Sequence, residues 1–202
     1  MYIARILYPI KVLGPGRRVG IWFDGCNHHC KGCSNPELWE IDERYKTDIY
    51  QVMRLIRSIE KENVIEGFTL TGGDPMIQAD GLRTLLPELM NISDDILMYT
   101  GYEYEVIRDT YKDILANIAV LVDGKYIEEF NIGELLKGST NQKIIVLNTK
   151  YKEKYDNYIS THRSEIQNFT TPSGTISVGI HRPGYEKALD TKLKQKGLLK
   201  NE

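Results

Sequence analysis

The sequence predicts an α/β protein: a partial (β/α) barrel of mostly parallel strands with outer helices, plus a C-terminal strand extension. Strand-like and helix-like segments alternate along the chain, which is the pattern of a parallel sheet with helical crossovers. With 202 residues, the chain is too short for the eight repeats of a closed barrel. Several expected strands end in glycine, and in parallel α/β folds ligands bind beyond the carboxyl ends of the strands.

Two strands are expected at the start of the chain. "MYIARILYPI" (1–10) has one early Arg and a proline, Pro9, in its apolar part, so it favours an opening strand over a signal peptide. "RRVGIWFDG" (17–25) is rich in β-branched and aromatic residues and stops at Gly25. A loop that contains every cysteine of the chain follows directly.

The next segments predict a helix, a strand and a second helix. Apolar residues recur at helical spacing across 47–62, with Thr47 as the expected N-cap. The segment 64–73 reads as a strand that ends in two glycines. A helix is expected at 80–92, and Pro87 should kink or divide it.

Alternation continues through the middle of the chain. Strands are expected at 95–101, 118–124 and 142–148, with helices at 103–116 and 150–163. The apolar runs within the second and third of these strands predict burial on both faces of a parallel sheet.

The last part of the chain predicts an addition to this core. "EIQNF" and "GTISVGI" favour a closing hairpin around Pro172–Gly174. We expect one domain over 1–185, with the strand extension starting at about residue 150. The polar, mixed-charge tail 186–202 is expected to be a frayed, solvated helix.

Composition narrows the function classes. The formal net charge is −2 and Lys and Arg form no dense run, so the sequence predicts no nucleic-acid partner. No apolar run approaches 18 residues, so no membrane-spanning segment is expected. Without cysteines outside one cluster there is no disulfide framework, and a reducing cytoplasm suits the chain.

The cysteine loop is the strongest chemical signal. Cys26, Cys30 and Cys33 lie within eight positions, among polar neighbours that argue against three buried core thiols. Thiolates suit zinc or iron–sulfur clusters. Structural zinc would need His28 or His29 as fourth ligand, and the chain lacks the usual second short-spaced pair. A 4Fe-4S cluster on three cysteines would leave one iron open to a substrate.

These blocks resemble the radical S-adenosylmethionine (radical SAM) enzymes, whose signature is Cys-x3-Cys-x2-Cys after the first strand and a later strand that ends in "GGDP". The finer similarity is to the activating proteins of glycyl radical enzymes, especially of the anaerobic ribonucleotide reductase. The matching blocks run from about residue 12 to 147: "GPGRR", "GCNHHCKGCSNPELW", "TLTGGDPMIQ", "MYTGYEYEVI", "VLVDGKY" and "KGSTNQKI".

The resemblance implies a cofactor pair and a partner. Cys26, Cys30 and Cys33 would hold a 4Fe-4S cluster, and S-adenosylmethionine would bind its open iron. One-electron reduction would then yield methionine and a 5'-deoxyadenosyl radical that abstracts a hydrogen atom. The implied substrate is a glycine Cα–H of a glycyl radical enzyme, an anaerobic ribonucleoside-triphosphate reductase, with a flavodoxin- or ferredoxin-type electron donor.

The same resemblance assigns two strand ends to S-adenosylmethionine. Gly72, Gly73 and Asp74 match the motif that grips the methionine amino group. Glycines allow close backbone approach and carbonyl and carboxylate oxygens accept from an ammonium. Thr100 and Gly101 match further contacts with the cofactor. The alternative for each segment is a plain turn, in which Asp74 caps the next helix.

Later blocks suggest further contacts. By family analogy Asp123 lies near the ribose or the substrate, although Asp-Gly is also a strong turn dipeptide. Ser139, Asn141 and Gln142 match a block that holds cofactor or substrate, and the alternative is turn chemistry before a strand. Lys125 departs from the family block, so we assign it no role.

Two other functions remain open from the sequence. The segment beyond about residue 150 extends past the compact core of the reductase activases, so the substrate could instead be a peptide or a small molecule, with His181 and Arg182 of interest. A zinc-stabilised binding module without catalysis is the third reading. We expect neither His28 nor His29 to be a metal ligand.

Overall fold

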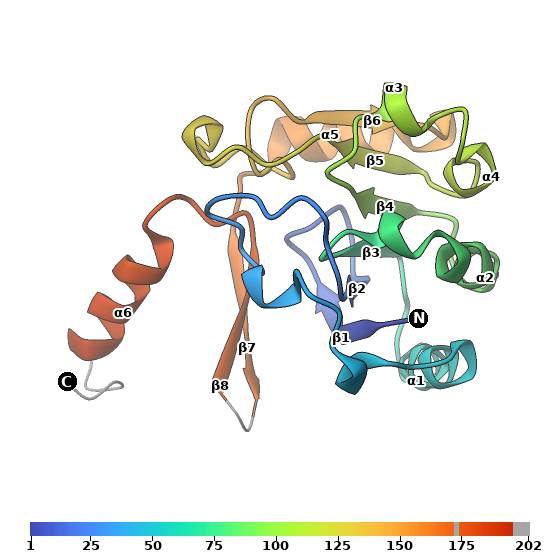
Figure 1. Ribbon diagram of the computed structural model, residues 1–202, viewed down its shortest axis with the longest axis horizontal. Helices are drawn as coiled ribbons and strands as arrows, with labels where there is room; N and C mark the ends of the chain where they lie inside the picture. Colours follow the sequence, from blue (N-terminus) through green and yellow to red (C-terminus); the bar gives the residue numbers. More distant parts are fainter. Residues whose placement is uncertain (172–173, 196–202) are drawn as a thin grey trace.

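A computed structural model describes residues 1–171 and 174–195 of the chain (Figure 1). Six strands form one sheet in the order β1-β2-β3-β4-β5-β6, in which β2 to β5 run parallel and both edge strands run antiparallel to their neighbours. Within the described residues the two edge strands do not pair, so the barrel is partial, as predicted. The strands are β1 Ile3–Ile10, β2 Arg18–Phe23, β3 Gly67–Gly72, β4 Ile96–Tyr99, β5 Val120–Asp123 and β6 Lys143–Val146.

Helices pack around this sheet and confirm the α/β class (Figure 1). None of the helices in the two described ranges is both long and apolar enough to cross a membrane. The α-helices are α1 Ile49–Glu62, α2 Ala79–Met90, α3 Tyr104–Ile107, α4 Lys112–Leu115, α5 Lys152–Thr161 and α6 Tyr185–Gln195. Short 3₁₀ helices are η1 Pro36–Leu38, η2 Glu43–Tyr45, η3 Pro75–Gln78, η4 Glu128–Phe130 and η5 Thr149–Tyr151.

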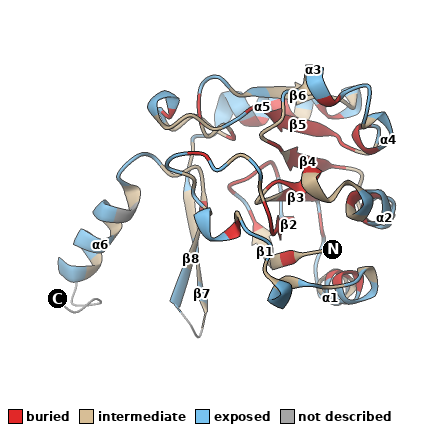
Figure 2. Ribbon diagram, viewed as in Figure 1, coloured by how far each residue is buried: buried red, intermediate tan, exposed pale blue. Residues whose placement is uncertain are grey.

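Both faces of the central sheet are buried. Successive side chains of a strand point to opposite faces, and a separate apolar cluster covers each face. In β4, Ile96 and Met98 join the cluster that contains α1 and α2, whereas Leu97 joins the cluster that contains α5. This period of two is the geometry of a strand covered on both sides. Figure 2 shows the central strands as the most buried part of the fold.

Three local predictions need correction. The N-cap of α1 is Asp48, whose side chain accepts from the Gln51 amide, and not Thr47. Helix α2 runs continuously through Pro87, so the predicted division does not occur. The helix expected at 103–116 is split into α3 and α4, because the intervening "RDTY" contains Asp and Thr, which are poor helix formers.

The strand predicted at 142–148 forms, but its predicted burial in a parallel sheet is wrong. β6 pairs antiparallel with β5, with Val146 opposite Val120 and Lys143 opposite Asp123, and its residues are exposed or half-buried. The connection from β5 contains only the short η4, so no long helical crossover carries the chain back to the starting edge. A direct return produces an antiparallel neighbour, here at the sheet edge.

The C-terminal strands form the predicted hairpin as a separate two-stranded sheet. β7 (Ile166–Thr171) pairs antiparallel with β8 (Gly174–Gly179). Most of the turn expected around Pro172–Gly174 lies outside the described residues, as does the end of the predicted tail, 196–202. The part of the tail that is described is helical in α6, which extends away from the sheet (Figure 1).

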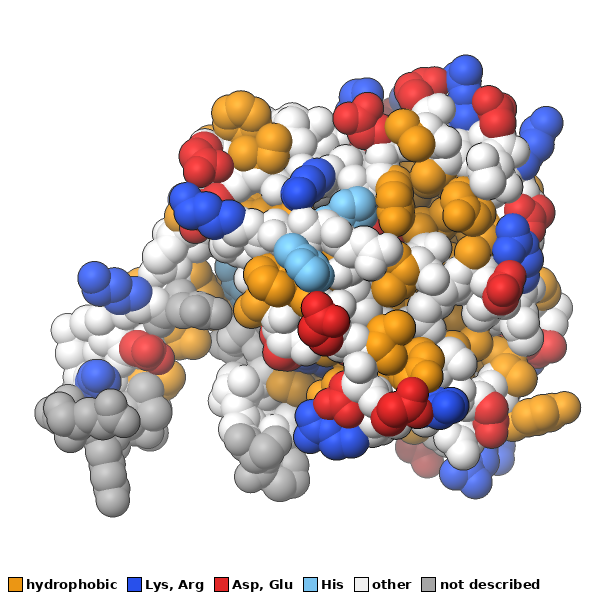
Figure 3. Space-filling model, in the orientation of Figure 1, with side chains coloured by type: hydrophobic (Ala, Val, Ile, Leu, Met, Phe, Trp, Pro, Cys, Tyr) orange, Lys and Arg blue, Asp and Glu red, His pale blue; other side chains and the backbone are white. Residues whose placement is uncertain are grey.

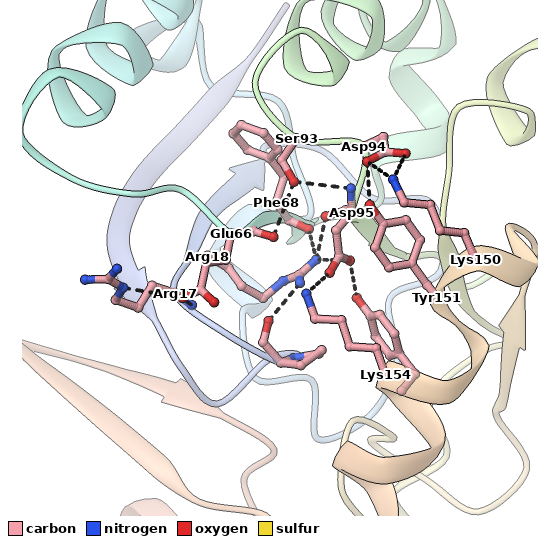
Figure 4. Close-up of polar contacts among 12 residues, drawn as sticks. Arg17, Arg18, Glu66, Phe68, Ser93, Asp94, Asp95, Lys150, Tyr151 and Lys154 are labelled. Carbon is pink, nitrogen blue, oxygen red and sulfur yellow. Dashed lines mark hydrogen bonds and ion pairs between the residues drawn. The ribbon is translucent and has the colours of Figure 1, made fainter.

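A buried ionic network ties α5 to the amino ends of the central strands (Figure 4). Arg18 is fully buried and donates to Thr69 Oγ1 at 2.8 Å, and to the Asp95 carbonyl and carboxylate at 2.9 and 3.2 Å. Asp95 also accepts from Lys154 Nζ at 2.6 Å and Tyr155 Oη at 2.7 Å. The network lies opposite the carboxyl edge of the sheet, the end that contributes to stability in barrel-like folds.

Replacing Asp95 by alanine should strongly destabilise the protein. The change leaves the guanidinium of Arg18 buried without its carboxylate, and breaking a buried pair in this way costs about 3–5 kcal/mol of unfolding free energy. Urea unfolding measures the loss. The matched control is Asp113→Ala, because Asp113 forms an exposed ion pair with Arg83 whose removal should leave the midpoint almost unchanged. Equal midpoints for the two variants would contradict the network.

The same carboxylate should shape the acid limit of stability. Burial raises the pKa of Asp95, but the charge of Arg18 and the hydrogen bonds from Lys154, Arg18 and Tyr155 outweigh it and hold the pKa below its usual value. A depressed folded-state pKa stabilises the fold above the unfolded value of about 3.9, and this stabilisation is lost as the pH falls through the folded value. Asp95→Asn should therefore show a shallower loss of stability below about pH 4.

Candidate cluster and cofactor site

The loops at the carboxyl ends of β2, β3, β4 and β5 meet at one pocket, as the sequence predicts. The four loops are the cysteine loop and the segments "TGGDP", "TGY" and "VDGKY", which the sequence predicts to converge. The residues that line the pocket from these loops include Cys26, His28, Cys30, Cys33, Gly72, Gly73, Asp74, Thr100, Gly101, Gly124 and Tyr126.

The cysteine loop is fixed by its own backbone. Gly25 adopts a φ of 96°, a left-handed conformation that suits glycine, and its amide donates to the carbonyl of Leu38 in η1. The amide of Cys26 donates to Trp39 O at 2.8 Å. The loop is thus closed against the segment that follows it, and all three thiols line the pocket.

The thiols fit an iron–sulfur cluster. Cys26 Sγ accepts from the His28 amide and Cys33 Sγ from the Asn35 amide, each at 3.4 Å, and such hydrogen bonds tune a cluster's potential. Burial raises the pKa of Cys26 and Cys30, and the nearby Lys125 charge acts in the opposite direction on Cys30. Each thiolate of a 4Fe-4S cluster binds a different iron, so the three thiols must surround one shared space and not converge on a single point.

The zinc reading finds no support in the ligand arrangement. Within 1–171 and 174–195, no three His, Cys, Asp or Glu side chains converge closely enough to hold a single ion. His28 Nε2 is hydrogen-bonded to Asp74 Oδ2 at 2.8 Å, so it is already engaged. The other candidate, His29, stacks on Trp39 at the surface, with 49% of its side chain exposed.

Asp74 is a bridging residue between the loops. Its carboxylate is 1% exposed and accepts from the Met76 amide, the Thr100 hydroxyl and the Gly101 amide at 2.9–3.0 Å. His28 donates to the same group. The predicted alternative, that Asp74 caps the next helix, is confirmed, because the Met76 amide belongs to η3. With these bonds in place the carboxylate positions the pocket wall.

Two glycines allow the β3 end to approach the cysteine loop. Gly72 has a φ of 105°, and a Cβ there would lie 2.5 Å from Phe23 O. A Cβ on Gly73 would overlap the carbonyl oxygen of Gly25. The close approach expected of these glycines is thus an approach to the protein's own backbone at the base of the cysteine loop.

Three predicted site residues do not line the pocket. Asp123 is 2% exposed and its carboxylate accepts from the amides of Tyr104 and Lys143. Ser139 Oγ accepts from the Ile127 amide, and Asn141 Nδ2 donates to Lys125 O. All three tie loops together. Their assigned contacts with cofactor or substrate stay predictions.

Sequence reasoning missed part of the pocket. Gln142, a residue that the sequence predicts at the site, lines the pocket, but Gly138 of the same "KGSTNQKI" block and Asn131, in the loop after η4, were not foreseen. The hairpin contributes Ser177 to Gly179 and is followed by Ile180 and by His181, and of these residues only His181 was singled out from the sequence. The sequence predicted the hairpin itself, but nothing in its pattern indicates that β8 lies beside the cysteines.

Comparison with known proteins agrees with this arrangement. A family model described as a 4Fe-4S single cluster domain matches residues 12–145. Several relatives bear the name anaerobic ribonucleoside-triphosphate reductase-activating protein. The one from Vibrio cholerae is 34% identical over 145 residues, 68% of this chain and 93% of the relative. The one from Enterobacteria phage T4 is 32% identical over 148 residues (68% and 90%), and the one from Escherichia coli K12 is 28% identical over 145 residues (68% and 94%).

The cysteine loop, the barrel edge and the match over two thirds of the chain define a radical SAM enzyme with a single 4Fe-4S domain. Within that class, the chain belongs to the family of anaerobic ribonucleoside-triphosphate reductase-activating proteins. The family match ends at residue 145, so α5, the hairpin and α6 lie beyond it.

Proposed function

We propose that this protein binds S-adenosylmethionine at a 4Fe-4S cluster held by Cys26, Cys30 and Cys33 and installs a glycyl radical on an anaerobic ribonucleoside-triphosphate reductase. The observation that carries the proposal is the single pocket shared by the three thiols and the "GGDP" turn. When bound and reduced, the cluster would supply the one electron that cleaves the sulfonium of S-adenosylmethionine into methionine and a 5'-deoxyadenosyl radical. This radical would take the hydrogen atom from the glycine Cα.

The chain's own residues would bind and shield these groups. The three thiolates would hold the cluster, and one iron would be left without a cysteine ligand because the chain has only three cysteines. Main-chain groups at Gly72 and Gly73, which line the same pocket as the thiols, would hold the methionine end. Trp22 and Val178, which are 4% and 3% exposed, contribute apolar wall, and a dry wall limits the quenching of a radical by water.

The proposed setting follows from the same chemistry. A cluster with an open iron needs an external one-electron donor, and a flavodoxin- or ferredoxin-type protein is the class we propose. All three free thiols lie in the cluster loop, which suits a reducing, anaerobic cytoplasm.

Electron paramagnetic resonance tests this function directly. Reconstituted protein, dithionite, S-adenosylmethionine and the reductase of the same organism should give a doublet, because the unpaired electron on the glycine Cα couples to its remaining hydrogen. Reductase labelled with α-deuterated glycine should collapse the doublet to a near-singlet. Reductase in which the target glycine is alanine is the matched control, and it should give no signal.

A contrary result would redirect the assignment. If 5'-deoxyadenosine forms while an intact reductase acquires no radical, the radical chemistry stands and the reductase is not the substrate. The hairpin beyond the family match would then favour a different peptide or a small molecule, the second function that the sequence leaves open.

A further inference from the structure

The β7–β8 hairpin forms a pocket wall that lies outside the family match. The match ends at residue 145, and relatives covered over 90–94% of their length align with only 68% of this chain. β8 nevertheless lines the same pocket as the three cysteines, through Ser177, Val178 and Gly179. The strand therefore forms one wall of the pocket that contains the cysteines.

β8 presents its edge to the pocket. Side chains of successive strand residues point to opposite faces, so a strand that offers a face lines a pocket with every second residue. Here three consecutive residues line it. The Val178 side chain is buried in an apolar cluster with Trp22, while the Ser177 hydroxyl donates to Asn168 Oδ1 at 2.6 Å. What Ser177, Val178 and Gly179 all present to the pocket is their main chain.

This edge has no strand partner among residues 1–171 and 174–195, where β8 pairs with β7 alone. No β7 residue lines the pocket, so the edge on the pocket side is the outer edge of β8. An open edge is a row of main-chain donors and acceptors, and the ligand that satisfies such a row is another extended chain.

The edge is also held in place before any ligand arrives. In β7, Gln167 Nε2 donates to Pro9 O at 2.7 Å, and its Oε1 accepts from the Lys11 amide at 3.0 Å. Just beyond the end of β8, Asn131 Nδ2 donates to the carbonyl of His181 at 2.7 Å. A fixed edge loses little conformational freedom on binding, which favours affinity.

Charge offers no comparable signal. The face drawn in Figure 3 carries Lys and Arg side chains interspersed with Asp and Glu, with no large patch of one sign. Recognition is therefore inferred from the open edge of β8 and not from a charged patch.

We propose that the outer edge of β8 docks the glycine-bearing segment of the partner protein as an added antiparallel or parallel strand, so that its glycine Cα reaches the cluster pocket. The proposal rests on the proposed function and specifies how the substrate segment is held. Because main-chain bonds alternate along an added strand, every second residue of the segment would donate or accept, and the glycine itself would need no side-chain recognition.

A backbone N-methyl scan of the segment tests the alternation. Synthetic peptides of about 12 residues spanning the reductase glycine, each with one N-methyl group, are titrated against the cluster-loaded protein by fluorescence anisotropy. Methylation at alternate residues should weaken binding by about fivefold to tenfold, and methylation at the residues between should have little effect. A flat or irregular profile would overturn the docking mode.

A chain-side pair of variants tests the same edge. Ile180 follows the last β7–β8 pair, Ile166 with Gly179, so its amide lies beyond that ladder. Ile180→Pro removes this amide hydrogen, whereas Ile180→Ala keeps it and removes the side chain. We expect proline to weaken binding of the unmethylated peptide by about fivefold or more relative to alanine. Iron content and circular dichroism verify both folds, and if the proline variant misfolds the peptide scan on unaltered protein decides.

The outcomes separate the inference from the function. A glycyl radical on the reductase together with a flat N-methyl profile would overturn the edge and leave the function intact. Absence of both the radical and peptide binding would overturn the function and the edge with it. A dimer in solution whose β8 amides are already protected from hydrogen exchange would show that a second copy occupies the edge, which also overturns the proposal.

Discussion

Cys30→Ser should remove the cluster and with it the cleavage of S-adenosylmethionine. Cys30 is the most buried of the three cysteines, at 9% exposure. The chain has no fourth cysteine that could take its place as a ligand. Serine is nearly isosteric but is a hard, weakly acidic ligand where iron–sulfur clusters need a soft thiolate. Bound iron should fall well below the about four atoms per chain of a complete cluster, and cleavage should fall by about 100-fold or more.

The measurement combines anaerobic iron analysis, the broad absorbance near 400 nm that bleaches with dithionite, and 5'-deoxyadenosine formation. His29→Ala is the matched control in the same loop. His29 is half-exposed and does not line the pocket, although its ring stacks on Trp39, which does. The control should keep iron and activity. Wild-type protein that is colourless and contains one zinc ion per chain would contradict the assignment of an iron–sulfur cluster to this loop.

The convergence of the main site was predictable because it follows from strand direction. Parallel strands end at the same edge of a sheet, so glycine-terminated strands before the cysteine loop, "TGGDP" and "TGY" must bring those segments together. The structure places Cys26, Gly73 and Thr100 in one pocket for that reason. The direction of β6 was not predictable from its apolar composition, because it depends on whether the preceding connection forms a helical crossover, and here that connection contains only η4.

Side-chain roles were less predictable than position. Asp123, Ser139 and Asn141 have the right chemistry for a ligand, but short polar side chains also satisfy nearby backbone groups, and here all three do so. The sequence does not distinguish these uses. The β8 wall was missed for a different reason, since its place depends on contacts such as Gln167 with Pro9, 158 positions apart.

Asp74→Asn should damage the site almost as severely as loss of a cysteine, although it changes neither size nor shape. The carboxylate accepts from Met76, Thr100, Gly101 and His28 together. An amide has one acceptor oxygen and two N–H donors, so at least one buried amide or imidazole donor would face another donor. Each unsatisfied buried donor costs about 1–3 kcal/mol of unfolding free energy, so the stability loss should lie in that range or above it.

The functional loss should exceed the stability loss, because the bonds of Asp74 join the cysteine loop to the loop after β4. His28 is the only one of the four donors that belongs to the cysteine loop, so freeing it should move that loop relative to Gly73 and Thr100. We expect cofactor cleavage to fall by about 10–100-fold at temperatures where the variant is fully folded, with iron content retained. Asp80→Asn, on the exposed surface of α2, is the control and should behave as wild type. Full cleavage by a folded Asp74→Asn variant would show that the bridge stabilises the fold without positioning the site.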